Sequence, residues 1–418
     1  MDNIANLSGK IEQQLPAELI SFIKLAAGIT DKRGQNLYLI GGAVRDLLLD
    51  KPNLDLDLVV AGNAIDLARQ LVEISPGKIT THPHFGTAKI QYEKWNVDLT
   101  TARSETYTKP GALPKVSPGN LRDDLFRRDF TINAMAVRLN HDRYGELIDL
   151  YSGRQDLEHR LVRILHEKSF IDDATRIWRA LRYEQRLGFQ IETATLRLLQ
   201  RDIPMLDTIS GDRIRYELEC ILQEQYPEKV IRRAEELGVL ARLHPSLKGS
   251  GWLAAKFEHA RLMSSPETPP MGVYLALLTY PLTGEELEKL ISYLRLPKKV
   301  AQIIRDTTRI KDKLHLLADP DLTASSVYSL LHEYSSLALS VNSIVSDSPV
   351  VKEHINQFLN ELRYVKCTLT GKDIIRMGYA NSPRITEILH RLHMAKLDGQ
   401  VTSKQDEERM AREWHSIS

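Results

Sequence analysis

LYLIGGAVRD at residues 37–46 and LDLDLVV at residues 54–60 decide the fold of this chain. Successive side chains of a β-strand point to opposite faces, so the three leucines of the second segment, Leu54 included, are predicted to enter a core. Asp55 and Asp57 then project from one surface, one pleat apart. The two segments therefore predict a strand that presents two carboxylates close to a glycine-containing turn.

This turn and the carboxylate pair have a chemical interpretation. Gly41 and Gly42 stand where a strand enters a helix, so backbone N–H groups and a helix N-terminus can receive a triphosphate. Paired carboxylates can hold Mg²⁺, which prefers oxygen ligands and keeps coordination positions for substrate phosphates. Each feature alone has an ordinary alternative, a plain turn or a solvated strand face. Together they favour metal-assisted transfer of a nucleotidyl group.

Composition sets the broad class. The chain has 418 residues, enough for two or more domains, and its 56 basic and 55 acidic residues neither favour nor exclude a nucleic-acid partner. Two cysteines, Cys220 and Cys367, argue against a disulfide framework or a cysteine-based zinc site and fit a reducing compartment. We find neither an apolar run of about 18 residues nor the layout of a signal peptide, so we expect a cytoplasmic protein with no membrane partner.

The pattern changes near residue 155. Before it, strands and helices alternate, and residues 87–92 and 95–101 are expected to pair as a hairpin. Residues 107–120 contain three prolines and two glycines and are predicted to form a long irregular loop. Beyond residue 155 helical periodicity dominates, with one helix expected near 172–188. We therefore predict an α+β fold in four parts, which are a head (1–155), a helical neck (156–222), a helical body (223–330) and a helical tail (331–418).

A third carboxylate extends the predicted metal site. Asp98 lies on the second strand of the expected hairpin. A carboxylate on a neighbouring strand is what a two-metal site needs to share ligands between its ions. The alternative is an ordinary aspartate on the surface of a hairpin.

A second cluster of polar residues runs from Arg127 to Asn133. Two adjacent arginines, Arg127 and Arg128, suit triphosphate oxygens, because guanidinium groups form forked hydrogen bonds. Asp129 and Asn133 can recognise ribose hydroxyls. The alternative is a capped, salt-bridged start of a helix.

A third cluster, residues 172–183, has helical periodicity with two chemically different flanks. An aspartate and an arginine one turn apart can offer acceptors and forked donors to the edge of a nucleobase. A salt bridge between residues i and i+3 on a solvated helix is the simpler alternative. The apolar flank comprises Ala174, Ile177, Trp178 and Leu181, and the polar flank comprises Asp172, Arg176, Arg179 and Tyr183, with Asp173 at its edge.

These motifs, in this order, resemble those of the class II tRNA nucleotidyltransferases. That bacterial family contains CCA-adding, CC-adding and A-adding enzymes and poly(A) polymerases, and it belongs to the DNA polymerase β-like superfamily. Its first motif corresponds to residues 41–57, its ribose-recognition motif to residues 127–134 and a helix-start motif to residues 210–218. Its amino-acid template motif, usually Glu-Asp-x-x-Arg, corresponds to residues 172–176, with Asp172 in place of the glutamate.

The resemblance implies a polymerase β-like nucleotidyltransferase head with a small mixed sheet, a neck with the nucleobase-reading motif, and a tail that binds tRNA. It implies template-independent tRNA processing with CTP and/or ATP, in which Asp173 and Arg176 read the base and residues 107–120 act as a lever. The acceptor stem and elbow of tRNA would be recognised by shape. The implied catalytic residues and ligands of two Mg²⁺ ions are Asp55, Asp57 and Asp98. The implied nucleotide-binding residues are Gly41, Gly42, Arg45, Arg128, Asp129, Asn133, Asp172, Asp173, Arg176 and Arg179.

The nucleotide specificity is open at this point. Addition or completion of the whole CCA end is the leading interpretation, and an enzyme that adds only the final A, working with a separate CC-adding enzyme, is the main alternative. The long 107–120 segment weighs against CC addition alone, and the lack of a basic C-terminal extension weighs against poly(A) synthesis. A catalytically silent RNA-binding protein and a metal-dependent RNA hydrolase are the alternatives from other classes.

Overall fold

The computed structural model describes residues 5–75, 77–379 and 383–416, and the chain divides into two compact units. The first unit comprises the chain up to Tyr226 together with Glu236–Arg242, and the second comprises Pro227–Glu235 and the chain from Leu243 onward. The first is a mixed α/β body and the described part of the second is helical. The expected α+β class is confirmed, whereas the finer division into head, neck, body and tail stays a prediction.

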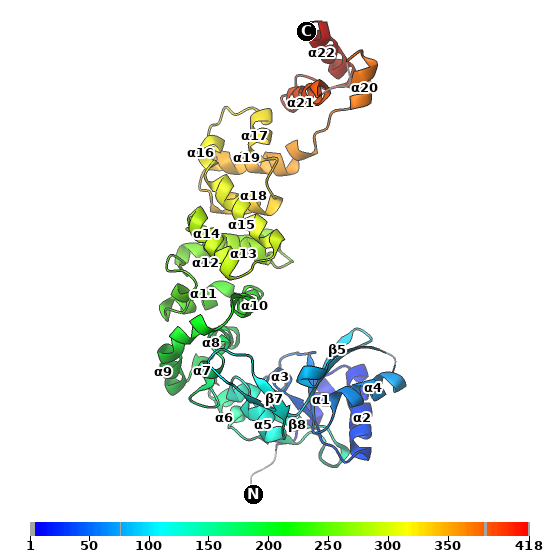
Figure 1. The fold of residues 1–418 in the computed structure, drawn as a ribbon, viewed down its shortest axis with the longest axis vertical. Coiled ribbons are helices and arrows are strands. Elements are labelled where there is room, and N and C mark those ends of the chain that lie inside the picture. The colour runs from blue at the N-terminus through cyan, green and yellow to red at the C-terminus, as the bar shows by residue number, and fades with distance from the viewer. Residues whose placement is uncertain (1–4, 76, 380–382, 417–418) are drawn as a thin grey trace. The chain divides into compact units, whose positions relative to one another are not determined.

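A seven-stranded mixed sheet organises the first unit, in the order β3-β4-β5-β2-β1-β8-β9. Figure 1 labels β5 and β8 of this sheet. β2 and β5 are parallel, and the other neighbouring pairs are antiparallel. The strands are β1 (Leu37–Ile40), β2 (Leu56–Val60), β3 (Lys78–His82), β4 (Thr87–Tyr92), β5 (Trp95–Thr101), β8 (Met135–Arg138) and β9 (Leu147–Asp149). The expected hairpin is confirmed, because Tyr92 pairs with Trp95 across a two-residue turn.

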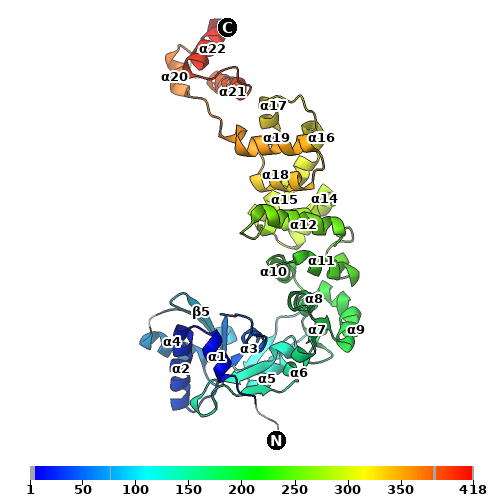
Figure 2. The same cartoon turned by 180° about the vertical axis from the view of Figure 1, so that it is seen from behind.

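Alternation along the strands assigns the two faces of the sheet. Leu37 and Leu39 of β1 join a core with helices α2 and α4, which lie side by side in Figure 2. Tyr38 and Ile40 pack on the opposite face, in a second cluster that includes Leu125. The helices of this part are α1 (Ser8–Gln14), α2 (Ala17–Lys32), α3 (Gly42–Leu48), α4 (Ala64–Ile74), α5 (Leu121–Phe126) and α6 (Gly153–Glu158).

Two expectations about the strands of the first unit were wrong. Leu54 is 40% exposed, because the strand begins only at Leu56, and the chain has not yet entered the sheet at position 54. Within residues 107–120, the strand β7 (Lys115–Pro118) pairs antiparallel with β6 (Arg103–Thr106). A proline is tolerated there because the hairpin is a separate two-stranded sheet, and both of its strands are edges.

The helical part of the first unit confirms the apolar flank predicted for residues 172–183, whose four members are fully buried. The helix expected near 172–188 is broken, because Asp173 has an extended backbone between α7 and α8. The elements are β10 (Leu161–Val162), α7 (Ser169–Asp172), α8 (Thr175–Leu187), β11 (Gln190–Ile191), α9 (Thr193–Asp202), the 3₁₀ helix η4 (Ile203–Thr208) and α10 (Gly211–Leu222).

The second unit has helices and no strand among its described residues. Helices α13, α15 and α18 contact one another, and separate apolar clusters form around Val327 and Ile374. No helix in the described ranges has both the length and the apolar character that a bilayer crossing requires. The helices are α11 (Pro227–Glu236), α12 (Gly251–Ser264), α13 (Met271–Thr279), α14 (Gly284–Tyr293), α15 (Lys298–Lys311), α16 (Leu314–Leu317), α17 (Ala324–Leu331), α18 (Ser336–Val345), α19 (Pro349–Asn360), α20 (Gly371–Arg376), α21 (Arg384–Leu397) and α22 (Lys404–Ser416).

Candidate active site

Asp57 and Asp98 stand opposite each other on the parallel strands β2 and β5. Their neighbours Leu56, Leu58, Val97 and Leu99 enter the core on the α2/α4 face, so both carboxylates project from the other face. Asp55 shares that alternation but precedes the strand and is exposed. Sheet register thus places two of the three predicted carboxylates side by side, with the third two residues away.

The electrostatics of this group centre on Asp57. Burial raises the pKa of its carboxyl to about 6, and the nearby carboxylates of Asp98 and Asp55 add to the rise, while the guanidinium of Arg128 opposes it. Asp98 has a more exposed environment, with Lys89 Nζ 3.7 Å from its Oδ2. When Asp57 is ionised, the positive charge near it in this structure therefore does not balance the negative charge of the neighbouring carboxylates.

The donor chemistry of these residues fits a hard cation such as Mg²⁺, because carboxylate oxygens crowd one another and need a neutralising partner. Within the described ranges, however, no three histidine, cysteine, aspartate or glutamate side chains converge closely enough to hold a metal ion. Any metal here would take ligands from outside the protein as well, as Mg²⁺ usually does with substrate phosphates and water.

The Gly41–Gly42 turn connects this group to the arginines. Gly41 has a left-handed backbone, with φ of 69°, and a Cβ there would lie 2.8 Å from Nη1 of Arg128. The same position is 3.7 Å from Oδ2 of Asp57. The positive φ favours glycine at this position, and a side chain there would have to displace the Arg128 guanidinium.

Arg45 has a different environment from the one expected of a phosphate ligand. Its side chain is buried, with only 2% of the residue exposed, and all three of its nitrogens are used within the protein. Nε and Nη2 each donate to Asp46 at 2.8 Å, and Nη1 donates to Oδ1 of Asn133 at 2.7 Å. The geometry makes Arg45 a residue that orients Asn133.

Asn133 in turn positions Asp129. Its Nδ2 donates to Oδ1 of Asp129 at 3.0 Å, and Arg179 donates from Nε and Nη2 to Oδ2 of Asp129 at 2.9 and 2.6 Å. Burial acts to raise the pKa of Asp129, but the charge of Arg179 and the hydrogen bond from Asn133 outweigh it and lower the pKa to about 2. Asp129 is therefore an ionised, doubly fixed carboxylate.

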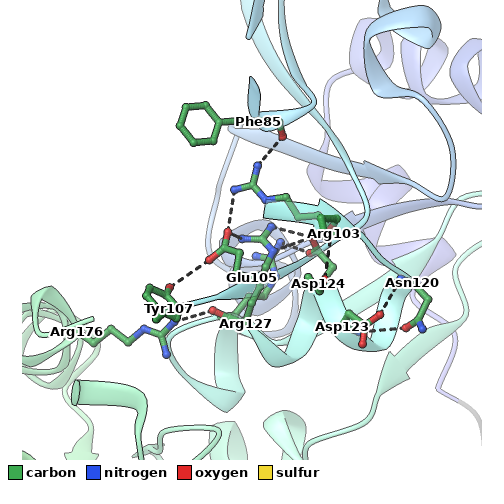
Figure 3. A network of polar contacts seen from close by, with 12 residues as sticks. Phe85, Arg103, Glu105, Tyr107, Asn120, Asp123, Asp124, Arg127 and Arg176 are labelled. Atoms are coloured by element: carbon green, nitrogen blue, oxygen red, sulfur yellow. Dashed lines mark hydrogen bonds and ion pairs between the residues drawn. The ribbon is translucent and has the colours of Figure 1, made fainter. Parts of the chain in front are cut away.

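A second network holds Arg127 and Arg176, as Figure 3 shows, and it also holds Arg128. Asp124, fully buried, accepts from Arg127 at 2.7 Å and from Arg128 at 3.1 Å. Arg176 donates to the backbone carbonyl of Arg127 at 2.7 Å and to Oγ of Ser169 at 2.6 Å. Within the described residues, Asp173 and Arg176 do not form the salt bridge between residues i and i+3 that was the alternative, because Arg176 is buried against other elements and Asp173 pairs with Arg213.

Glu105 lies at the centre of the same network. It accepts from Nη2 of Arg103 and from Nη1 of Arg127, both at 3.1 Å, and from the hydroxyl of Tyr107 at 3.2 Å (Figure 3). Burial raises the pKa of Tyr107 to about 12, so its hydroxyl stays protonated and donates. The hairpin β6–β7 is thereby joined to the arginines of the ribose-recognition motif.

A cavity of about 250 Å³ gathers these groups. It brings together five of the predicted nucleotide-binding residues, Arg127 of the ribose-recognition motif, and two residues that belong to no motif, Glu105 and Tyr107. Its lining is Glu105, Tyr107, Arg127, Arg128, Asp129, Asp173, Arg176 and Arg179. Gly41, Gly42, Arg45, Asn133 and Asp172 are outside this lining, and Nδ1 of His166 is 4.0 Å from Oδ2 of Asp172.

Sequence reasoning missed Glu105, which lies in β6 and belongs to none of the motifs, and Tyr107, which begins the segment predicted as a loop. Only their short distance in space from the arginines, which depends on the fold, identifies them. It also missed Arg213, which forms an ion pair with Asp173 at 2.7 Å. The family's helix-start motif contains Arg213, but nothing in that motif alone indicates a partner 40 positions earlier.

Comparison with known proteins places these features in context. Residues 37–163 match the model of the poly A polymerase head domain, and residues 188–249 match that of the probable RNA- and SrmB-binding site of polymerase A. An A-adding tRNA nucleotidyltransferase of Halalkalibacterium halodurans is 30% identical over 98% of this chain and 96% of its own length. Another, of Geobacter sulfurreducens, is 32% identical over 96% of this chain, which spans 48% of that longer relative.

A solved structure shows the same fold. The CCA-adding enzyme of Thermotoga maritima, complexed with tRNA, aligns with a TM-score of 0.77 at 30% identity, over 99% of both chains.

Proposed function

This chain belongs to the class II tRNA nucleotidyltransferase family, and from that premise we propose that it builds or completes the 3′-terminal CCA of tRNA with CTP and/or ATP. The reaction joins the 3′-hydroxyl oxygen of the RNA to the α-phosphorus of the nucleotide, and pyrophosphate leaves. The two free cysteines fit the reducing cytoplasm as its location. The tRNA-binding role of residues 331–418 is part of this proposal.

The observation that carries the proposal is the position of Arg128. Its guanidinium lines the 250 Å³ cavity and also acts on the carboxyl of Asp57. A nucleotide in the cavity would therefore have its phosphates beside the carboxylate pair, where the RNA 3′-hydroxyl must attack the α-phosphorus. Arginine suits this position because its planar fork holds phosphate oxygens and keeps its charge at any working pH.

Asp55, Asp57 and Asp98 are the residues that would hold Mg²⁺ in this proposal. The ions supply charge neutralisation for the triphosphate and activation of the 3′-hydroxyl when bound. The protein itself contributes the crowded carboxylates, and the Gly41 turn that lets Arg128 approach them.

The remaining residues of the cavity set the identity of the nucleotide. Asp173 and Arg176 offer an acceptor and forked donors to the edge of a base, so no nucleic-acid template is needed. Asp129 and Arg179 form a fixed acceptor and donor pair for ribose and phosphate. Arg45 and Asn133 act indirectly, because their hydrogen bonds hold Asp129 in place.

Addition of the final A alone is the second candidate. Both sequence relatives described above carry the name A-adding, at 30% and 32% identity. The Asp172–Asp173 form of the template motif is compatible with either activity.

The test uses three tRNAs, one that lacks the whole CCA, one that ends in the first C and one that lacks only the final A. CTP and ATP are supplied separately, and extension is followed on gels. Extension of all three with the correct nucleotide indicates a CCA-adding enzyme, and extension of the third alone with ATP indicates an A-adding enzyme. No extension of any of them would refute the proposal, provided that a well-folded protein is shown by its thermal transition.

Two variants test the residue assignments in the same assay. Asp55→Ala should abolish incorporation while the fold remains, and normal incorporation would refute the metal assignment. Arg176→Ala should weaken the choice between CTP and ATP, and unchanged choice would refute its base-reading role. Arg69→Ala, on the exposed surface of α4, is the matched control.

A further inference from the structure

The tip of the β6–β7 hairpin rests on the helical part of the first unit. Gly111, at this tip, has a left-handed backbone with φ of 69°. A Cβ at Gly111 would lie 2.5 Å from the carbonyl oxygen of Thr208, the last residue of η4. No other side chain fits that position without displacing the tip, so glycine permits a close and specific contact.

A single guanidinium connects this tip to the nucleotide cavity. Arg213, in the first turn of α10, donates from Nη1 to the carbonyl oxygen of Gly111 at 3.3 Å. From Nη2 it donates to Oδ1 of Asp173 at 2.7 Å. One arm of the fork thus holds the hairpin and the other holds the carboxylate that is proposed to read the base.

The hydrogen bonds of Asp173 are unevenly divided between its two oxygens. Oδ1 accepts from Arg213, from the backbone N–H of Thr175 at 3.0 Å and from the hydroxyl of Thr175 at 2.6 Å. Every hydrogen bond that the structure gives this side chain, within the described ranges, ends on Oδ1. Oδ2 remains for a ligand, and its direction is set by the groups that hold Oδ1.

Arg213 itself is outside the cavity lining, whereas Asp173 is part of it. Arg213 therefore acts on a bound nucleotide through Asp173. Its two contacts also depend on each other, because a rigid planar guanidinium cannot follow a moving hairpin tip without changing its hydrogen bond to the carboxylate.

We propose that Arg213 is a positioning residue that couples the hairpin tip at Gly111 to Asp173, and that this coupling sets the discrimination between CTP and ATP. The inference rests on the proposed nucleotidyltransferase function. It assigns to one residue of the helix-start motif a role in base choice, in addition to any role in starting α10.

The experiment measures kcat and KM for CTP and for ATP on the tRNA ends that the wild-type protein extends. Arg213→Ala removes both arms of the fork, Arg213→Lys keeps a positive charge without the fork, and Gly111→Ala displaces the tip while leaving Arg213 and Asp173 in place. Arg215→Ala is the matched control, because this arginine of the same helix pairs with Asp212 and Glu219.

We expect Arg213→Ala to lower the ratio of kcat/KM for the correct over the incorrect nucleotide about tenfold, the scale of one lost charged hydrogen bond. Arg213→Lys and Gly111→Ala should lower the same ratio, and Arg215→Ala should leave it unchanged. Wild-type discrimination in Arg213→Ala, or full discrimination in Arg213→Lys, would overturn the coupling. If Arg213→Ala does not fold, Gly111→Ala decides, and unchanged discrimination there overturns it. A wild-type protein that extends no tRNA would instead refute the proposed function.

Discussion

Replacement of Asp57 by Asn tests the electrostatics of the site most directly. The substitution keeps the size of the side chain and removes its charge. In the wild-type protein, burial and the neighbouring carboxylates raise the pKa of Asp57 from 3.8 to about 6. Because the folded state binds the proton more tightly than the unfolded chain, ionisation of Asp57 destabilises the folded state as pH rises from about 4 to above 6.

The magnitude follows from the two pKa values. Each tenfold difference in proton affinity is worth about 1.4 kcal/mol, so ionised Asp57 costs the head about 3 kcal/mol at pH 8 and under about 1 kcal/mol at pH 4. Asp57→Asn removes this cost. We therefore expect the variant to be more stable than the wild type in metal-free buffer at pH 8, although it should no longer incorporate nucleotides.

Hydrogen exchange of peptides from β2 and β5, measured by mass spectrometry in EDTA, reports opening of this sheet without interference from the second unit. The stability difference between Asp57→Asn and the wild type should grow from pH 4 to pH 8. Asp66→Asn, at an exposed position of α4, is the control and should show no such trend. A difference that is the same at pH 4 and pH 8 would refute the assignment of a raised pKa to Asp57. Added Mg²⁺ should then protect the wild-type strands and leave those of Asp57→Asn unchanged.

Three further substitutions have definite expected outcomes. Asp129→Asn should raise the KM for nucleotide about tenfold, because Arg179 loses its charged partner. The effect should not vary between pH 5 and 9, since the pKa of Asp129 is about 2. An unchanged KM in steady-state incorporation would contradict this. Three arginine guanidiniums lie 5.2–5.7 Å from the ring centroid of Tyr183. Tyr183→Leu should therefore raise the KM for nucleotide several-fold, whereas Tyr183→Phe should restore it. Equal KM values for both variants would exclude the cation–π contribution. In the second unit, burial acts to raise the pKa of Glu407, but Lys396 and two backbone N–H groups outweigh it and lower the pKa. The contacts of ionised Glu407 therefore stabilise the folded state at neutral pH, and this stabilisation is lost in acid. Glu407→Gln should therefore weaken hydrogen-exchange protection of α20–α22 by about 2 kcal/mol at pH 7 and by less near pH 3, and equal loss at both pH values would contradict the charge argument.

The sequence by itself determined the features that depend on near neighbours. Alternation predicted that Asp57 leaves the core on a surface, and a short turn predicted the β4–β5 hairpin that carries Asp98. Helical periodicity predicted the buried flank of α8, from Ala174 to Leu181. The predicted strand started too early, at Leu54, because the alternation of apolar and charged residues begins before the first residue of β2 that pairs with a neighbouring strand.

Only the tertiary structure decided which charged groups are partners and which remain for a ligand. Arg45 turned out to hold Asn133, 88 positions away, and Arg213 to join Gly111 and Asp173, 102 and 40 positions away. A motif records which side chains are present, but a hydrogen bond also requires two segments to meet within about 3 Å, and this meeting is set by the packing of the sheet, the hairpin and the neck helices. For that reason most residues that line the cavity could be named from the sequence, whereas Glu105, Tyr107 and the division between residues that line the cavity and residues that position them could not.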